Sequence, residues 1–211
     1  NAEFKKTNFW RRNDIQRFKE IILGSKKNII WVFDNAGEDI FDFILIRILL
    51  KQGHNVILAA KSRPAVNDTT KDDLEDIVKD ERIRELLGKD IDRIKLVATG
   101  TRGLGTDLAR VAESEEFYRA WREADLIIFK GQGNYLTVRD NNPTKDCFFV
   151  LRVKWPAEVG NRYAQDSYVT EYLGSSKQGY AEFAKLIRYF ILRSLYLAGS
   201  GHTNTSLSDV E

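Results

Sequence analysis

The stretch NIIWVFDNAGEDIFDFILIRILLKQGHNVILAA, residues 28–60, decides the fold class. It contains two short apolar runs, residues 28–33 and 55–60, on either side of a segment with helical spacing, residues 38–53, that ends at a glycine. Short apolar runs of this kind are typical of strands that are buried on both faces of a sheet. A strand, a helix and a second strand in succession predict parallel pairing through a right-handed crossover.

The alternation of strands and helices continues along the chain. Further strands are expected at residues 94–99, 124–129 and 147–153, and further helices at residues 69–88 and 114–124. We therefore predict an α/β fold, a three-layer αβα sandwich with a mostly parallel, Rossmann-like sheet.

The two ends of the chain have a different character. Residues 4–23 have the mixed charged and apolar pattern of a helix, and residues 178–199 have the spacing of an amphipathic helix. We expect an N-terminal helical segment at residues 1–28, an α/β domain at residues 29–198 and a flexible tail at residues 199–211.

Composition excludes several classes of function. The 211 residues carry 33 Lys and Arg against 31 Asp and Glu, and because these charges are interspersed, no basic surface for nucleic acid is expected. No apolar run approaches the roughly 18 residues of a membrane span, so we expect no membrane partner and a cytoplasmic location. The single cysteine, Cys147, excludes an internal disulfide and a paired-cysteine metal site, and we interpret it as a small residue that begins a strand.

Acids and an amide follow two neighbouring predicted strands. Asp34 and Asn35 end the first strand, and Asp68 follows the second. Because ligands bind beyond the carboxyl ends of parallel strands, these side chains predict a hard-oxygen site for Mg²⁺ or Mn²⁺. Asp and Asn also cap helices and form turns, which is the alternative interpretation of each segment alone. We place His54 in a surface-like loop and His202 in the tail, so zinc is not expected.

Glycine-rich segments follow the next two strands, TGTRGLGTD at residues 99–107 and KGQGNY at residues 130–135. Glycine lets backbone N–H groups approach an anion closely, and Lys130 adds a positive charge, so this side favours a phosphate group. Neither segment matches the Walker or dinucleotide pattern. A cation facing an ammonium group would hold a phosphoryl group from both sides, which suggests hydrolysis of phosphate esters.

Three acids could orient the attacking water: Glu38, Asp42 and Asp107. We take Glu38 and Asp107 as candidate catalytic residues. As acids of a first helical turn, Glu38 and Asp42 could alternatively complement the helix dipole.

Five motifs in order, VFDNAGEDIFD, GHNVILAAKSRPAVNDTT, GTRGLGTDL, DLIIFKGQGN and FFVLRVKWP, resemble the DUF89 family of metal-dependent damage-control phosphatases over about residues 29–156. The resemblance implies a divalent ion (Mn²⁺, Mg²⁺, Co²⁺ or Ni²⁺) held by Asp34, Asn35 and Asp68. It also implies substrate contacts from Lys130 and Asn134. To these we add Gly131 and Gly133, whose backbone N–H groups can approach a phosphate, and Lys154, which stands in a place comparable to the lysine of a family signature. The implied substrates are small phosphorylated metabolites such as sugar phosphates or phosphopantetheine-like compounds.

The chain departs from the family pattern at several points. Ser62 and Arg63 stand where the family has two glycines before a proline, Trp155 stands where it has cysteine, and LRVKWP lacks the Arg-Thr-x-Lys signature of the carbohydrate-phosphatase branch. The family carries a helical domain before its first motif, so residues 1–28 are expected to be a remnant or a truncated form of it.

The leading interpretation is thus a metal-dependent phosphomonoesterase, with the oligomeric state left open. A truncated or degenerate domain that binds a phosphorylated ligand without catalysis is the first alternative. The second is an S-adenosylmethionine-dependent carboxyl methyltransferase, but methyl transfer needs no metal triad and the dinucleotide-type glycine pattern is absent.

Overall fold

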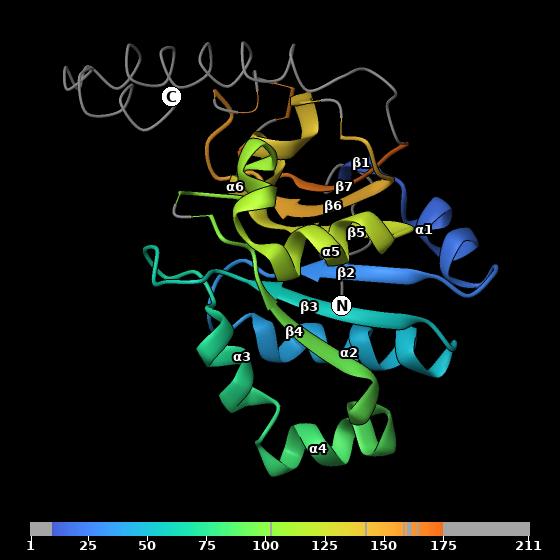
Figure 1. The fold of residues 1–211 in the computed structure, drawn as a ribbon. Coiled ribbons are helices and arrows are strands. Elements are labelled where there is room, and N and C mark those ends of the chain that lie inside the picture. The colour runs from blue at the N-terminus through green and yellow to red at the C-terminus, as the bar shows by residue number, and fades with distance from the viewer. Residues whose placement is uncertain are drawn as a thin grey trace.

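The computed structural model describes residues 10–101, 103–141, 143–157, 159, 162–163 and 165–174 (Figure 1). These residues build a seven-stranded sheet with the order β1-β7-β6-β5-β2-β3-β4. All neighbouring strands are parallel except β6 and β7. The strands are β1 Trp10–Asn13, β2 Asn28–Val32, β3 Asn55–Ala60, β4 Ile94–Ala98, β5 Leu126–Lys130, β6 Cys147–Arg152 and β7 Tyr168–Leu173.

Helices cover both faces of this sheet, which confirms the predicted α/β sandwich (Figure 1). One face packs against α1 Ile15–Ile22, α2 Asp39–Lys51, α3 Lys71–Ile77 and α4 Glu81–Leu87. The other face packs against α5 Glu115–Glu123 and α6 Gly131–Val138. Short 3-10 turns lie at Gly88–Arg93, Leu108–Glu113 and Arg139–Asn141.

Side chains of the central strands alternate between the two cores. In β2, Ile30 and Val32 pack on the α5 and α6 side, whereas Ile29 and Trp31 pack on the α2 side. In β5, which pairs with β2, Ile128 belongs to the α2 side. Because the period of a strand is two residues, the side chain of the last residue of β5 emerges on the α2 side as well.

The prediction of one helix over residues 4–23 was wrong in its middle. Residues 10–13 form β1, which pairs in parallel with β7, and α1 begins only at Ile15. The pairing partner lies more than 150 residues away, so the local charge and apolar pattern could not reveal it. Residues 1–9 lie outside the described residues, and the division into a segment 1–28 and an α/β domain stays a prediction.

The prediction of one helix over residues 69–88 was also wrong. The threonine cap exists, because Thr70 forms a capping box with Asp73 at the start of α3. A new helix, α4, then begins at Glu81, and its N-cap is Asp80, whose side chain accepts a hydrogen bond from the backbone N–H of Arg82. A second N-cap inside the predicted helix therefore divides it.

Three more features differ from the sequence expectations. α6 follows β5 directly where a loop was expected, and β7 was not predicted. His54 is buried rather than on the surface, because its two ring nitrogens bond to the backbones of Lys27 and Ile22. The predicted helix at 178–199 and the tail lie outside the described residues. Cys147 is buried at the start of β6, as predicted.

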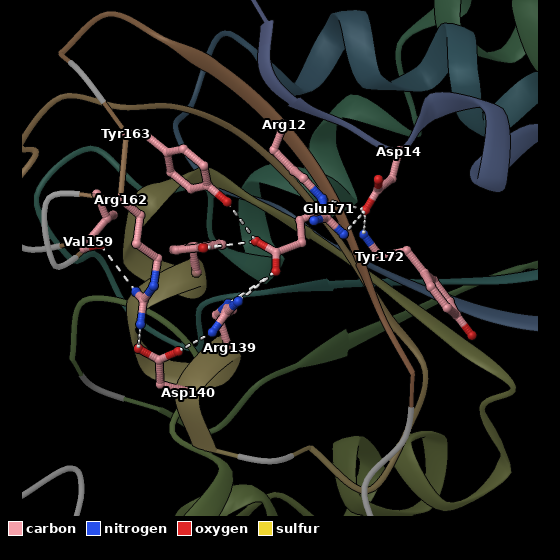
Figure 2. A network of polar contacts seen from close by, with 10 residues as sticks. Arg12, Asp14, Arg139, Asp140, Val159, Arg162, Tyr163, Glu171 and Tyr172 are labelled. Carbon is pink, nitrogen blue, oxygen red and sulfur yellow. Dashed lines mark hydrogen bonds and ion pairs between the residues drawn. The ribbon is translucent and has the colours of Figure 1, made fainter.

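A polar network joins β7 to the end of α6, as Figure 2 shows. Glu171 accepts hydrogen bonds from Tyr135 at 2.9 Å and Tyr163 at 3.2 Å, and it forms an ion pair with Arg139 at 2.9 Å. Glu171 is 3% exposed, and each of its oxygens has a donor. This arrangement satisfies a buried carboxylate and ties β7, which runs antiparallel to β6, to the α6 side.

α2 is apolar on its outer side as well as on its inner side. Between 42% and 72% of the surface of each of these outer side chains is exposed: Ile40, Phe41, Ile44, Leu45 and Ile48. Among the described residues, no helix combines the length and the apolar character that a membrane crossing requires.

Candidate functional site

Backbone contacts join the segments that follow β2 and β3, where the predicted metal residues lie. The backbone N–H of Thr69 donates to the carbonyl of Asp34 at 2.7 Å, and Asn35 and Asp68 form an isolated antiparallel bridge. The structure therefore brings Asp34, Asn35 and Asp68 together from two strand ends, as the sequence indicated.

The negative charges of the two carboxylates in this cluster, Asp34 and Asp68, repel each other. Burial, followed by the charge of Asp68, raises the pKa of Asp34 to about 6, and burial raises the pKa of Asp68 as well. Lys154 and Lys130 lower the pKa of Asp34, which places both positive charges near it. A divalent cation between the carboxylates would relieve their repulsion and their desolvation.

The chemistry of the donor atoms fits a hard divalent ion. The amide nitrogen of Asn35 donates to Asp34 at 3.1 Å and to Glu38 at 3.3 Å, so its carbonyl oxygen is the atom left to face an ion. Within the described ranges, no three His, Cys, Asp or Glu side chains form a group that could hold a metal by themselves. An ion at this cluster would therefore need the amide oxygen of Asn35 as well as the two carboxylates. Two carboxylates and an amide suit Mg²⁺ or Mn²⁺, which prefer oxygen ligands, better than zinc. Glu38, a candidate catalytic residue, lies at this cluster.

Gly131, the first residue of α6, lies directly against Asp34. Its φ is +80°, and a Cβ on it would collide with the Asp34 carboxylate. Gly133, two residues further along α6, lies against the carbonyl of Leu104. A Cβ on Gly133 would be 3.0 Å from that carbonyl oxygen. Glycine at both positions lets α6 approach the acidic cluster and the segment 103–105 closely.

Lys130 is held from the α2 side of the sheet. Its Nζ donates to Oδ1 of Asp42 at 2.7 Å, and the indole N–H of Trp31 donates to the other oxygen at 3.2 Å. Burial raises the pKa of Asp42, whereas Lys130 and Trp31 lower it. The sequence proposed Asp42 as a water-orienting acid, but in the structure its carboxylate faces the lysine.

Asn134 is buried, and its side chain is occupied by internal hydrogen bonds. The amide nitrogen donates to the carbonyls of Phe33 at 3.2 Å and Lys130 at 2.8 Å, and the amide oxygen accepts from Thr106 at 3.0 Å. These bonds connect the ends of β2 and β5. The implied substrate contact of Asn134 stays a prediction and would require one of these bonds to open.

Lys154 is placed by Gln132, a residue that the sequence analysis did not single out. Oε1 of Gln132 accepts from the backbone N–H groups of Lys154 at 2.7 Å and Trp155 at 3.2 Å, and its Nε2 donates to the carbonyl of Trp155 at 3.0 Å. Lys154 lowers the pKa of both Asp34 and Asp68. In the sequence, the one sign of this role was that a glutamine, Gln132, stands at the centre of the motif KGQGN.

Lys61 also has a role that sequence reasoning missed. It is 5% exposed, and its Nζ donates to the carbonyls of Gly103 at 2.6 Å and Gly105 at 2.8 Å. The same nitrogen lies 3.8 Å from Asp68. Lys61 thus fastens the glycine-rich segment to the acidic cluster, and a lysine at the end of an apolar strand was the signal for it.

Asp107 makes local contacts. Its carboxylate caps the 3-10 turn through the backbone N–H of Ala109 at 3.0 Å and lies 3.6 Å from Arg110. A capping role accounts for this acid, and its catalytic role stays a prediction.

Comparisons with known proteins point to one family. Residues 1–168 match the family described as "damage-control phosphatase ARMT1-like domain". A damage-control phosphatase of Pyrococcus horikoshii is 39% identical over 132 residues, which are 62% of this chain and 41% of that protein. One of Arabidopsis thaliana is 38% identical over 131 residues, 59% of this chain and 35% of that protein.

The fold has a solved counterpart as well. The crystal structure of a DUF89 family protein from Pyrococcus horikoshii aligns with a TM-score of 0.62 and 34% identity, covering 78% of this chain and 53% of that one. The chain therefore spans about half or less of the length of these relatives.

Proposed function

Because this chain belongs to the damage-control phosphatase ARMT1-like family, we propose that it is a divalent-metal-dependent phosphatase, a hydrolase of phosphate monoesters of small metabolites. Sugar phosphates and damaged phosphorylated cofactors are the proposed substrates. The observation that carries the proposal is the bridge between Asn35 and Asp68, which assembles an all-oxygen cluster beside Asp34 and the start of α6.

Each part of the site has a proposed task. Asp34, Asn35 and Asp68 would hold the ion, which in such sites polarises a phosphoryl oxygen and acidifies a bound water. Lys130 and Lys154 would attract the phosphate dianion and hold it near the cluster. Both positive charges lower the pKa of Asp34, as charges close to that carboxylate do.

Glu38, hydrogen-bonded to Asn35, is the nearest described candidate to accept a proton from the attacking water. Glu38 would take a proton from the water as the bond from the water oxygen to phosphorus forms and the ester P–O bond breaks, and the leaving alkoxide would take up a proton from solvent water.

The test is phosphate release from p-nitrophenyl phosphate and from a panel of phosphorylated sugars and cofactors. Each substrate is assayed with chelator and with Mg²⁺, Mn²⁺, Co²⁺ or Ni²⁺. We expect release to require an ion and to fall by about a hundredfold or more in Asp68→Asn, because an ion ligand and its charge are lost. Asp76→Asn is the control, since Asp76 is an exposed acid of α3 paired with Lys79.

Two results separate the outcomes. Equal turnover in wild type and Asp68→Asn would remove the proposed ion site. A phosphate-binding domain without catalysis is the second candidate. Binding of Mn²⁺ and inorganic phosphate in calorimetry, without release from any ester, would support that candidate.

A further inference from the structure

A buried acid outside the ion site holds the lysine that faces the phosphate. The side chains of Lys130 and Asp42 are 15% and 8% exposed, and their charged atoms lie 2.7 Å apart. Trp31 donates to the second oxygen of Asp42 at 3.2 Å. The carboxylate therefore has one donor on each oxygen, and its orientation is fixed by both.

We propose that Asp42 is a positioning residue: it fixes the ammonium of Lys130 at the phosphate-binding side of the site, and Trp31 fixes Asp42. This inference rests on the proposed phosphatase function. Asp42 itself contacts the lysine and not the reacting atoms.

The geometry of the sheet explains why the pair forms. Lys130 ends β5, and its side chain emerges on the face where Trp31 of β2 also packs. α2 crosses this face, and Asp42 lies in its first turn, directly after the turn that carries the ion ligands. A one-residue shift of β5 would send the lysine to the α6 side, away from its partner.

Stability alone does not account for this pair. Removing two charges from water is costly, and apolar residues of similar size often stabilise a core at least as well. A free lysine side chain also loses rotamer entropy when it is fixed. The contact with Asp42 already fixes the lysine in the folded protein, so the ammonium is in place when the substrate arrives.

The ammonium keeps donors for a ligand. The ammonium of a lysine has three N–H bonds, and within the described part of the chain Asp42 is the one hydrogen-bond partner of the Lys130 ammonium. Gly131, the residue after Lys130, lies against the carboxylate of Asp34, and the charge of Lys130 lowers the pKa of Asp34, so the ammonium acts at the acidic cluster. A phosphoryl oxygen bound there would accept from a lysine that Asp42 has oriented.

The experiment is a double-mutant cycle with Asp42→Asn, Lys130→Met and the double variant. Asparagine keeps the shape of the aspartate and an acceptor for Trp31 but removes the charge that holds the lysine. We expect kcat/KM to fall by roughly 10- to 100-fold in Asp42→Asn, with the affinity for Mn²⁺ unchanged. In the Lys130→Met background the same change should have little further effect, because there is no lysine left to position.

Glu171→Gln is the matched control for the loss of a buried acid. Glu171 forms an ion pair with Arg139 at 2.9 Å in the network of Figure 2, and its strand, β7, is separated from β5 by β6 in the sheet. We expect it to lower the melting temperature and to keep kcat/KM per folded molecule. Trp31→Phe, which removes the indole N–H alone, should give a smaller loss than Asp42→Asn.

The outcomes separate this inference from the proposed function. Turnover of Asp42→Asn equal to wild type, or the same loss in both backgrounds, would overturn the positioning role while the phosphatase stands. If wild type releases phosphate from no ester, the proposed function fails, and the cycle is measured as the Kd of inorganic phosphate with Mg²⁺. The same coupling in Kd would support the positioning role, and additive effects or no phosphate binding would overturn it.

Discussion

Gly131 and Asp34 lie so close that the first residue of α6 has no room for a side chain. The contact sets how near the helix comes to the acidic cluster, and the positive φ of Gly131 makes any other residue strained there. The two residues follow neighbouring strands, Gly131 after β5 and Asp34 after β2, so the contact also fixes the two halves of the site relative to each other.

Gly131→Ala should destabilise the protein and disrupt the ion cluster. The backbone strain costs about 1–2 kcal/mol and the collision with Asp34 about 1–3 kcal/mol more. Gly53→Ala is the control, because Gly53 has a φ of +87° and no atom near its missing Cβ. Urea unfolding should show a larger decrease in the free energy of unfolding for Gly131→Ala than for Gly53→Ala. Calorimetry should show weaker Mn²⁺ binding in Gly131→Ala alone. Equal losses in both variants would contradict the close contact.

Asp34→Asn should stabilise the ion-free protein at high pH. In the folded state the pKa of Asp34 is about 6, above its usual 3.8, so the folded protein holds the proton more tightly than the unfolded chain does. Stability is then lost as the pH rises from about 4 to about 6, by at most about 3 kcal/mol for this group. Asparagine does not ionise, so the variant should gain stability at pH 8 and little at pH 4.

Urea unfolding with chelator at both pH values checks this expectation, with Asp76→Asn as the exposed control. Saturating Mn²⁺ should reverse the order at pH 8, because the ion stabilises the wild type through binding. A loss of stability in ion-free Asp34→Asn at pH 8 would contradict the cause given for the pKa.

Gln132→Ala should weaken substrate binding through Lys154. The change removes three hydrogen bonds to the backbone of residues 154–155, so the lysine is no longer held beside the cluster. We expect KM to rise on the order of tenfold, about the effect of one lost charged contact. Lys154→Ala should raise KM similarly, and the double variant should add little. Gln52→Ala, in the exposed end of α2, should leave KM unchanged; additive effects of the first two changes would mean that Gln132 does not act through Lys154.

The central part of the fold could be predicted because its strands are continuous apolar runs that carry their own signal. The order of polar residues at the ends of β2 and β3 likewise placed Asp34, Asn35 and Asp68 together. β1 could not be predicted in this way, since its character comes from pairing with β7, a strand far away in the sequence. The strand propensity of a ten-residue window carries no information about a pairing with a distant strand.

The supporting residues of the site were harder to predict than its ion cluster. Asp42, Gln132 and Lys61 act through contacts across 88, 22 and 42–44 residues of sequence. Their chemistry is ordinary for a helix start, a glycine-rich turn and a strand end, so only the three-dimensional arrangement shows what each one holds.

The pairing of β2 with β5 at the middle of the sheet has a consequence for dynamics. Asp34 follows one of these strands and Lys130 ends the other, and two or more strands lie on either side of the pair. Opening of the sheet from its edges can therefore proceed through β1 or β4 without separating the two residues. Amide hydrogens of β2 and β5 should exchange with solvent only through the largest unfolding events of the domain, so the site should stay assembled for as long as the domain itself is folded.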